Sequence, residues 1–309
     1  MDAYHQPVLV QESLELLAAA RGGLFIDCTL GPGGHAEALL EGFPEIRLLG
    51  VDRDPQALEL AADRLARFGP RVQLVCGNFH HLSELSGAPD KESVAGILAD
   101  LGVSSLQLDR AERGFSFRAA GPLDMRMGRS GPTARDIVNE YPEAELERIF
   151  KEYGEEAQAR RIARAVVEAR KDEPFETTTE LAELVTRIKS RGRRGRSGRI
   201  HSATQVFQAL RIEVNQELAG LGRFIDEAVD LLEAEGRLVI ISYHSLEDRI
   251  VKNRLRDLAR GDIDRITGRP RTETQLIEVL TKRPVTPSET EVGANPRSRS
   301  AKLRAARKL

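Results

Sequence analysis

A glycine-rich segment with the sequence Asp-Cys-Thr-Leu-Gly-Pro-Gly-Gly-His occupies residues 27–35, between a short apolar run and a helical pattern. Glycines have no Cβ, so the turn can tighten and a ligand can approach the main chain and the start of the next helix. Asp52 ends the following apolar run, 21 residues after Gly31, where a carboxylate can bind a ribose diol. Together these features favour a nucleoside-cofactor site over a simple tight turn.

Two more candidate site residues follow later apolar runs. Asp100 comes directly after the run at 94–99. A carboxylate in that place must be solvated, used to cap a helix or used in chemistry, and we favour chemistry. Phe79 follows the run at 72–76, where it could lie against an adenine ring or pack in the core. The residues alone leave both readings of Phe79 open.

Elements of two kinds must position these residues. Short apolar runs alternate with helical patterns between residues 24 and 102, which is typical of parallel strands joined by crossover helices. Asp54 followed by Pro55 marks the start of one helix, as a cap and a first-turn proline. We expect strands at 24–27, 47–52, 72–76 and 94–100, and a helix at 55–68.

The alternation stops after the fourth run, and residues 133–232 show mostly the helical period. A buried-strand pattern returns at 237–243, and 275–280 and 301–306 could form a hairpin with a polar connection at 284–296. The pattern therefore predicts an α/β fold. We expect a mostly parallel sheet with an antiparallel terminal strand, interrupted by an all-helical insertion.

Composition excludes several classes of protein. The 309 residues are 40% apolar, and 46 Lys and Arg against 48 Asp and Glu leave a net charge of −2. No window approaches the roughly 18 apolar residues of a membrane span, so we expect a cytoplasmic protein with no membrane partner. Cys28 and Cys76 make no disulfide framework, and we interpret both as reduced thiols that behave as small buried hydrophobes.

A series of motifs in this order resembles the bacterial RsmH (MraW) enzymes over nearly the whole chain. These enzymes transfer a methyl group from S-adenosylmethionine to the N4 amine of a cytidine in the decoding centre, the P-site region, of 16S ribosomal RNA. The motifs are His-Gln-Pro-Val-Leu at 5–9, the glycine-rich segment at 27–35, Val-Asp-Arg-Asp-Pro at 51–55, 100–107, Arg-Gly-Phe-Ser-Phe at 113–117, Gly-Pro-Leu-Asp-Met-Arg-Met at 121–127, Phe-Gln-Ala-Leu-Arg-Ile at 207–212, 242–249 and 295–304.

The resemblance implies a class I (Rossmann-like) methyltransferase fold. Its cofactor-binding domain would comprise residues 1–107 and 213–309, with a helical RNA-recognition insertion at 108–212. The implied partner is 16S ribosomal RNA or the small ribosomal subunit, and a homodimer is compatible with the sequence. Carried over residue by residue, the resemblance implies cofactor contacts from Gly33, Gly34, His35, Asp52, Phe79, Asp100 and Gln107.

The places of the two cysteines favour methylation of an exocyclic amine over methylation of a ring carbon. Methylation of pyrimidine C5 needs a cysteine nucleophile, whereas an exocyclic amine needs alignment and a hydrogen-bond acceptor. Cys28 and Cys76 belong to the cofactor-side strands, which disfavours C5 chemistry. The amine lone pair is delocalised into the ring, so a carboxylate that accepts an N–H would help to localise it. We interpret Asp100 as this acceptor.

Reaching N4 in packed RNA requires extrusion of the base into a pocket that stacks it. Phe115, Phe117, Tyr243 and His244 are the candidates to contact it. Each Phe could equally be a core residue. Tyr243 stands where the family commonly has Phe. His244 could contact the base as a catalytic residue, but we favour the interpretation that it orients the loop after the fifth strand.

Basic residues are concentrated at 189–199, where six of eleven are Lys or Arg with no acid. We interpret Arg193, Arg194 and Arg196 as part of a phosphate-binding arm rather than a solvated loop. The pair His80-His81 lacks further ligands at metal spacing, so we expect a helix start and no metal site.

Two functions from other classes compete with the methyltransferase. The α/β alternation alone permits a dinucleotide dehydrogenase with a helical substrate domain, but the glycine spacing is not Gly-x-Gly-x-x-Gly. A non-catalytic RNA-binding assembly factor that retains a nucleoside site is the other alternative. Stabilisation by S-adenosylmethionine and not by NAD, together with transfer of labelled methyl groups, separates the three.

Overall fold

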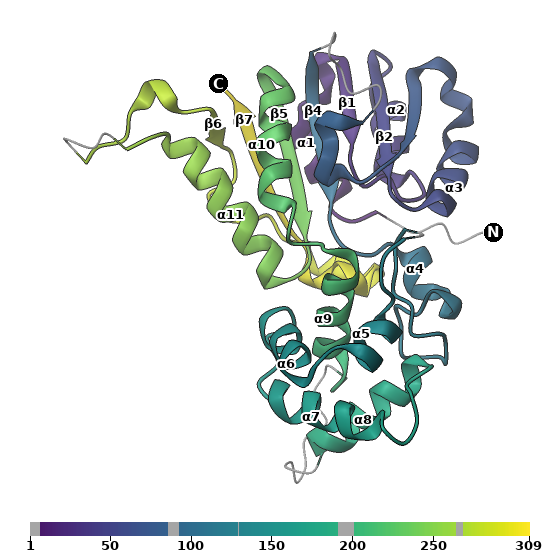
Figure 1. Cartoon of the computed structure of the whole chain (residues 1–309). Coiled ribbons are helices and arrows are strands. Elements are labelled where there is room, and N and C mark those ends of the chain that lie inside the picture. The colour runs from purple at the N-terminus through teal and green to yellow at the C-terminus, as the bar shows by residue number, and fades with distance from the viewer. Residues whose placement is uncertain (1–6, 86–92, 129, 191–200, 264–267) are drawn as a thin grey trace. The chain divides into compact units, whose positions relative to one another are not determined.

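The chain forms two compact units, as Figure 1 shows. The structure is a computed structural model that describes residues 7–85, 93–128, 130–190, 201–263 and 268–309. Met1–Gly102 and Leu218–Leu309 together make the first, which we call the sheet unit. Val103–Glu217 makes the second, the helical unit. No helix in the described ranges is long and apolar enough to span a bilayer.

The sheet unit is built on a seven-stranded sheet with the order β3-β2-β1-β4-β5-β7-β6. Strands β1 to β5 are parallel, and β7 is antiparallel to both β5 and β6. This confirms the mostly parallel sheet with an antiparallel terminal strand. The strands are β1 (Gly23–Asp27), β2 (Ile46–Asp52), β3 (Val72–Cys76), β4 (Val94–Asp100), β5 (Leu232–Ser242), β6 (Ile277–Val279) and β7 (Lys302–Lys308).

The strand order creates a switch point between β1 and β4. The chain runs outward from β1 to β3 and then crosses back to place β4 on the other side of β1. At such a point the connections at the carboxyl ends of the two strands diverge, which leaves room for a ligand. The acids that end β1, β2 and β4 therefore lie along one edge of the sheet.

Buried apolar residues explain why these segments form central strands. The first six residues of β4 are all buried, as expected of a parallel strand covered on both faces. Gly96 is required in the middle of β4, because a Cβ there would lie 2.4 Å from the ring of Phe25 on β1. The neighbouring strand thus fills the space that a larger residue would need.

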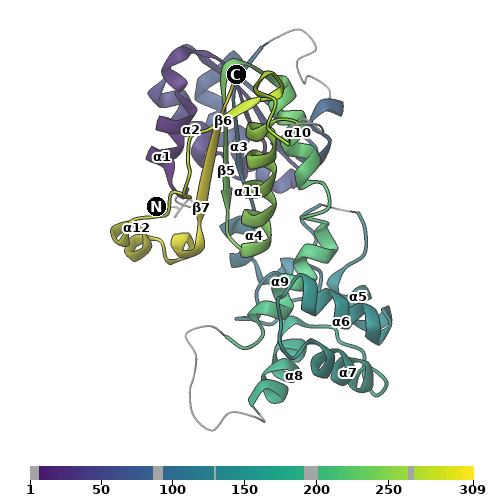
Figure 2. The same ribbon diagram turned by 90° about the vertical axis from the view of Figure 1, so that its left-hand side faces the viewer.

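Helices cover both faces of the sheet (Figure 2). One face packs on α1 (Val10–Leu17), α2 (Gly34–Gly42) and α3 (Pro55–Leu65), which contribute buried residues such as Leu17 and Leu39. The other packs on α10 (Leu221–Leu231) and α11 (Ser245–Arg260), through Phe224 and Leu255 among others. The unit also contains α12 (Glu289–Ala294).

The helical unit has its own apolar core, which includes Phe150, Val185 and Leu210. Its described residues contain helices and the isolated bridge Pro122–Thr177 but no strand, which agrees with the helical period of the sequence. The helices are α4 (Ser105–Asp109), α5 (Ala134–Glu140), α6 (Glu143–Glu152), α7 (Ala159–Ala169), α8 (Thr178–Ser190) and α9 (Thr204–Asn215).

Two expected segments differ from the structure. The helix expected at 55–68 ends at Leu65, because a 3-10 segment with Gly69 at a positive φ of 55° follows it. Strands β6 and β7 pair antiparallel as expected, and the connection between them is more regular than expected, because it contains α12 and a 3-10 turn at Pro296–Ser300.

Candidate functional site

The glycine-rich segment forms the turn between β1 and α2. Gly31 and Gly33 have φ values of 53° and 84°, in the left-handed region that favours glycine. Gly33 is the N-cap of α2. A Cβ on Gly34 would lie 3.0 Å from Pro7. Side chains of the sheet unit fill the space beside Gly33 and Gly34, whereas a Cβ on Gly31 would meet only the Thr29 carbonyl oxygen, at 3.9 Å, so main chain without a side chain is presented at Gly31.

Asp52 at the end of β2 shapes this turn. One carboxylate oxygen accepts the backbone N–H of Gly31 at 2.7 Å, and the other accepts that of Asp54 at 2.8 Å. Burial raises the pKa of Asp52, while these two N–H groups oppose the increase. The predicted ribose-binding carboxylate thus also holds the glycine turn in place.

Asp100 at the end of β4 has two unequal carboxylate oxygens. Oδ1 accepts the hydroxyl of Tyr243 at 2.9 Å, and Oδ2 lies 3.9 Å from Nδ1 of His35, too far for a hydrogen bond. The backbone N–H of Asp100 donates to Oγ1 of Thr29 at 2.6 Å. Burial raises the pKa of Asp100 to about 7, against the lowering effect of the Tyr243 hydroxyl.

Asp27, at the end of β1, is a third acid in this group and is more deeply buried than Asp52 and Asp100, which are partly exposed. It is 2% exposed, and its Oδ1 accepts the backbone N–H of Thr29 at 3.1 Å. Burial raises the pKa of Asp27 to about 7, and His35 opposes this increase. No site role was assigned to Asp27 from the sequence, although the signal that singled out Asp52 and Asp100, an acid at a strand end, was present there too.

His35 in the first turn of α2 is held through its ring. Its Nε2 lies 2.9 Å from the carbonyl oxygen of Val8. Because a carbonyl accepts and never donates, Nε2 carries a proton and donates it to this hydrogen bond. Burial lowers the pKa of His35, whereas Asp27 opposes this decrease. Nδ1 lies on the side of Asp100.

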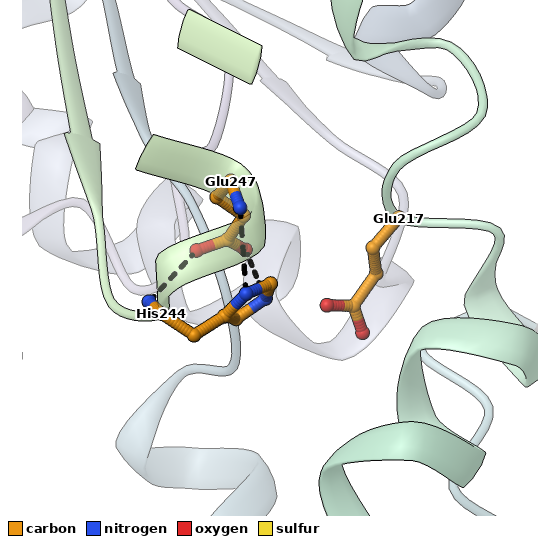
Figure 3. Close-up of side chains that lie close together, drawn as sticks. All are labelled: Glu217, His244 and Glu247. Atoms are coloured by element: carbon orange, nitrogen blue, oxygen red, sulfur yellow. Dashed lines mark hydrogen bonds and ion pairs between the residues drawn. The ribbon is translucent and has the colours of Figure 1, made fainter. Parts of the chain in front are cut away.

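His244 caps helix α11 together with Glu247, as Figure 3 shows. Its Nδ1 accepts the backbone N–H of Glu247 at 3.4 Å, and Glu247 Oε2 accepts the backbone N–H groups of Tyr243 and His244 at 3.0 and 3.4 Å. His244 Nε2 lies 3.1 Å from Glu247 Oε1. These contacts orient the loop after β5, and a catalytic role for His244 stays a prediction.

Phe79 packs between other rings. It begins the 3-10 segment Phe79–Glu84, and its ring contacts those of Phe224 and His80 edge-on, with centroids 4.8 and 4.6 Å apart. It is partly buried against the core of the sheet unit. Its contact with a cofactor stays a prediction.

The remaining predicted residues belong to the helical unit. Gln107 closes a capping box with Ser104 on α4. Phe115 is 7% exposed in the core of the unit, and Phe117 stacks on His201 with centroids 4.6 Å apart. Their roles toward cofactor or base stay predictions, whereas Arg193, Arg194 and Arg196 lie outside the described residues.

The two cysteines differ, and the expectation that both are buried was wrong. Cys28 is buried just after β1, and burial raises the pKa of its thiol well above the ordinary value. Cys76 is exposed. As the last residue of β3, an outer strand of the sheet, it is covered less than a residue of a central strand.

Comparison with known proteins identifies the family. The model of the MraW methylase family matches residues 2–309. A curated relative from Geobacter sulfurreducens is named "Ribosomal RNA small subunit methyltransferase H" and is 50% identical over 314 residues, 99% of each chain. Relatives with the same name come from Dehalococcoides mccartyi, 48% identical over 99% of this chain and 86% of theirs, and from Persephonella marina, 47% identical over 99% of both.

The chain belongs to the MraW methylase family. It is therefore a methyltransferase that uses S-adenosylmethionine. Membership in the MraW family excludes the dinucleotide dehydrogenase. The resemblance seen in the sequence motifs is confirmed across the chain.

The acids at the strand ends of this MraW protein fit a cationic cofactor. Asp27 is buried and Asp100 is partly buried, with 17% of its side chain exposed, and within the described ranges no Lys or Arg forms an ion pair with either. A buried carboxylate without a cation is costly. S-adenosylmethionine carries a sulfonium and an ammonium group, so Asp27, Asp100 and the Asp52-supported glycine turn form a suitable site for it.

Proposed function

We propose that this protein methylates the N4 amine of a cytidine in the decoding centre of 16S ribosomal RNA. The names of its curated relatives support the small-subunit RNA as the substrate. The hydrogen bonding of the Asp100 carboxylate is the observation that favours an amine as the group that is methylated. Its Oδ1 is occupied by Tyr243, whereas no hydrogen bond from a described residue reaches its Oδ2.

The proposed chemistry needs an acceptor beside the amine. S-adenosylmethionine, when bound, supplies the methyl group. Asp100 Oδ2 accepts one N–H of the cytosine amine, which localises the nitrogen lone pair as the N–C bond forms. The amine must then lose one proton. A carboxylate with a pKa of about 7 is well matched to take that proton near neutral pH.

One substitution tests the acceptor. Asp100→Asn retains an oxygen for Tyr243 but presents an amide instead of a base to the substrate. We expect it to bind S-adenosylhomocysteine and to lose most of its turnover with small-subunit RNA. Normal cofactor binding with full turnover would remove Asp100 from this role.

Methylation at C5 is the competing chemistry, because Cys76 is exposed. The buried thiol of Cys28 is unsuited to nucleophilic attack, since burial keeps it protonated. We expect Cys76→Ser to keep full activity. Loss of activity in this variant, with product mass spectra of the parent showing 5-methylcytidine, would favour C5.

The helical unit supplies the proposed RNA-recognition surface. Arg160 and Arg164 are exposed and four residues apart on α7, and among the described residues neither forms an ion pair. Like charges at this spacing destabilise a helix by about 0.2–0.5 kcal/mol. A phosphate backbone bound along α7 would offset that cost.

The RNA surface is tested by salt dependence. We expect the double variant Arg160→Ala with Arg164→Ala to bind RNA more weakly, with a salt slope reduced by about 0.7 for each phosphate that is no longer neutralised. Arg135→Ala is the matched control, since Arg135 is also exposed but is paired with Glu176 at 2.7 Å. Equal effects of both changes would argue for general charge and against an α7 surface.

The basic segment at 189–199 is tested separately. Replacement of Arg193, Arg194 and Arg196 by Ala should weaken RNA binding and leave cofactor affinity intact. Unchanged RNA affinity would assign this segment to the solvated surface.

The modified nucleotide is identified in cells. Nucleoside mass spectrometry of 16S ribosomal RNA from cells with and without the protein should show loss of an N4-methylated cytidine from the decoding centre. Complementation with Asp100→Asn distinguishes an enzyme from a non-catalytic assembly factor. An unchanged nucleoside profile would refute the proposal.

A further inference from the structure

Tyr243 is held at both ends in the loop after β5. Its backbone N–H donates to Glu247 Oε2 at 3.0 Å, and its hydroxyl donates to Asp100 Oδ1 at 2.9 Å. The ring passes close to Gly102, where a Cβ would lie 3.5 Å from Tyr243 Cδ2. The phenol is therefore fixed by its surroundings, with its hydroxyl on the acid that ends β4.

No other described side chain donates a hydrogen bond to the Asp100 carboxylate. From α2, Nδ1 of His35 lies 3.9 Å from Oδ2, too far for a hydrogen bond. From β1, Asp27 is a second acid, and the Thr29 hydroxyl meets the backbone of Asp100 rather than its carboxylate. From α11, Glu247 adds a further negative charge. Among these groups, Tyr243 alone favours the ionised carboxylate, because its hydroxyl donates a hydrogen bond to it.

We propose that Tyr243 is a positioning residue for methyl transfer, whose hydroxyl fixes Oδ1 of Asp100 and leaves Oδ2 to accept the substrate amine. This inference rests on the role proposed for Asp100. It differs from stacking on the base, the role that the sequence suggested for Tyr243, because the hydroxyl and not the ring face is the working group.

Titration of the two groups supports this assignment. Burial and the neighbouring acids raise the pKa of Tyr243 well above 10, so its hydroxyl stays a donor throughout the working pH range. The same hydrogen bond lowers the pKa of Asp100 against its burial. Without the hydroxyl, more of Asp100 would be protonated at neutral pH and unable to accept an N–H.

The decisive experiment compares the full-length protein with Tyr243→Phe by carbon-13 NMR of labelled aspartate carboxyl carbons. The Asp100 signal is assigned by its absence in Asp100→Asn. We expect its titration midpoint, about 7 in the parent protein, to rise by about one pH unit in Tyr243→Phe, as loss of a hydrogen bond to a charged group predicts. At pH 7 the ionised fraction, and with it turnover, should fall about five-fold.

Thr29→Val is the matched control. It removes the hydroxyl that meets the Asp100 backbone and leaves the carboxylate bond to Tyr243 in place. We expect lower turnover at every pH with an unchanged Asp100 midpoint. Of the two variants, only Tyr243→Phe should shift the acid limb of the pH–turnover profile to higher pH.

The titration needs no RNA, so it is independent of which nucleotide is methylated. An upward shift of the Asp100 midpoint together with the acid limb would support the proposal. An unchanged midpoint in Tyr243→Phe, or a loss of turnover that is equal at every pH, would overturn it even if the cytidine assignment holds.

Discussion

Replacing Asp27 by Asn should make the sheet unit more stable at alkaline pH. Asn retains the oxygen that accepts the Thr29 N–H at 3.1 Å but cannot ionise. The pKa of Asp27 rises from its ordinary 3.8 to about 7 because the side chain is buried. The folded state therefore binds more protons than the unfolded state between these values, so the free energy of unfolding falls as pH rises from about 4 to 7.

The size of the effect follows from the pKa difference. A shift of about three units corresponds to about 4 kcal/mol, at roughly 1.4 kcal/mol per unit. Nearby Asp100 and Asp52 contribute to the raised pKa and titrate with Asp27, so that figure is an upper bound. We expect Asp27→Asn to gain about 2–4 kcal/mol over the parent at pH 8 and almost nothing at pH 4.

Urea unfolding of the cofactor-free protein, followed by circular dichroism at pH 4, 5.5, 7 and 8, measures this difference. Hydrogen exchange of β1 and β4 amides assigns it to the sheet unit. Asp63→Asn, the same change at an exposed position on α3, should leave the pH curve unaltered. Parallel curves for Asp27→Asn and the parent would refute the reasoning. Tighter cofactor binding by the variant would contradict the role of Asp27 toward a cationic ligand.

Three further changes have measurable outcomes. Gly33→Ala should lower the free energy of unfolding by about 1–2 kcal/mol, because φ is 84° there and a Cβ would press on Leu65 at 3.3 Å. It should also weaken the binding of S-adenosylhomocysteine measured by calorimetry. Gly42→Ala is the control, since its Cβ would meet no atom within 4 Å, and it should leave the free energy of unfolding unchanged. Asp54→Ala removes the N-cap that accepts the Gln56 N–H and should cost about 1 kcal/mol in urea unfolding, and an unchanged midpoint would contradict this. Phe150→Ala should destabilise the helical unit by about 3–5 kcal/mol, seen as faster hydrogen exchange in α6 and α9; slow exchange there would show that the core tolerates the cavity.

Most strands of the sheet unit could be predicted from the local pattern of apolar residues. Parallel strands such as β4 are continuous apolar runs because both faces are covered, and an acid after such a run marks the edge where ligands bind. Asp27, Asp52 and Asp100 all carry this signal. Family motifs identified the cofactor, but they left the partners of each carboxylate undetermined.

Contacts between segments that are far apart in the sequence could not be predicted from the local sequence pattern. The bond between Tyr243 and Asp100 joins residues 143 apart and depends on the register of β4 against β5. The exposure of Cys76 depends on β3 lying at one side of the sheet. The capping role of Glu247 was missed as well, although its place three residues after His244 is the usual spacing for a capping box.

The insertion of the helical unit between β4 and β5 has a consequence for synthesis. A ribosome completes the first four strands, with all three strand-end acids, and must then translate the whole insertion before β5 emerges. Translation at about 5–20 residues per second would leave the growing sheet with an unpaired side for several seconds or more. During that interval β4 is an open edge available to other chains, so rapid folding of the inserted helices would matter for yield as well as for recognition.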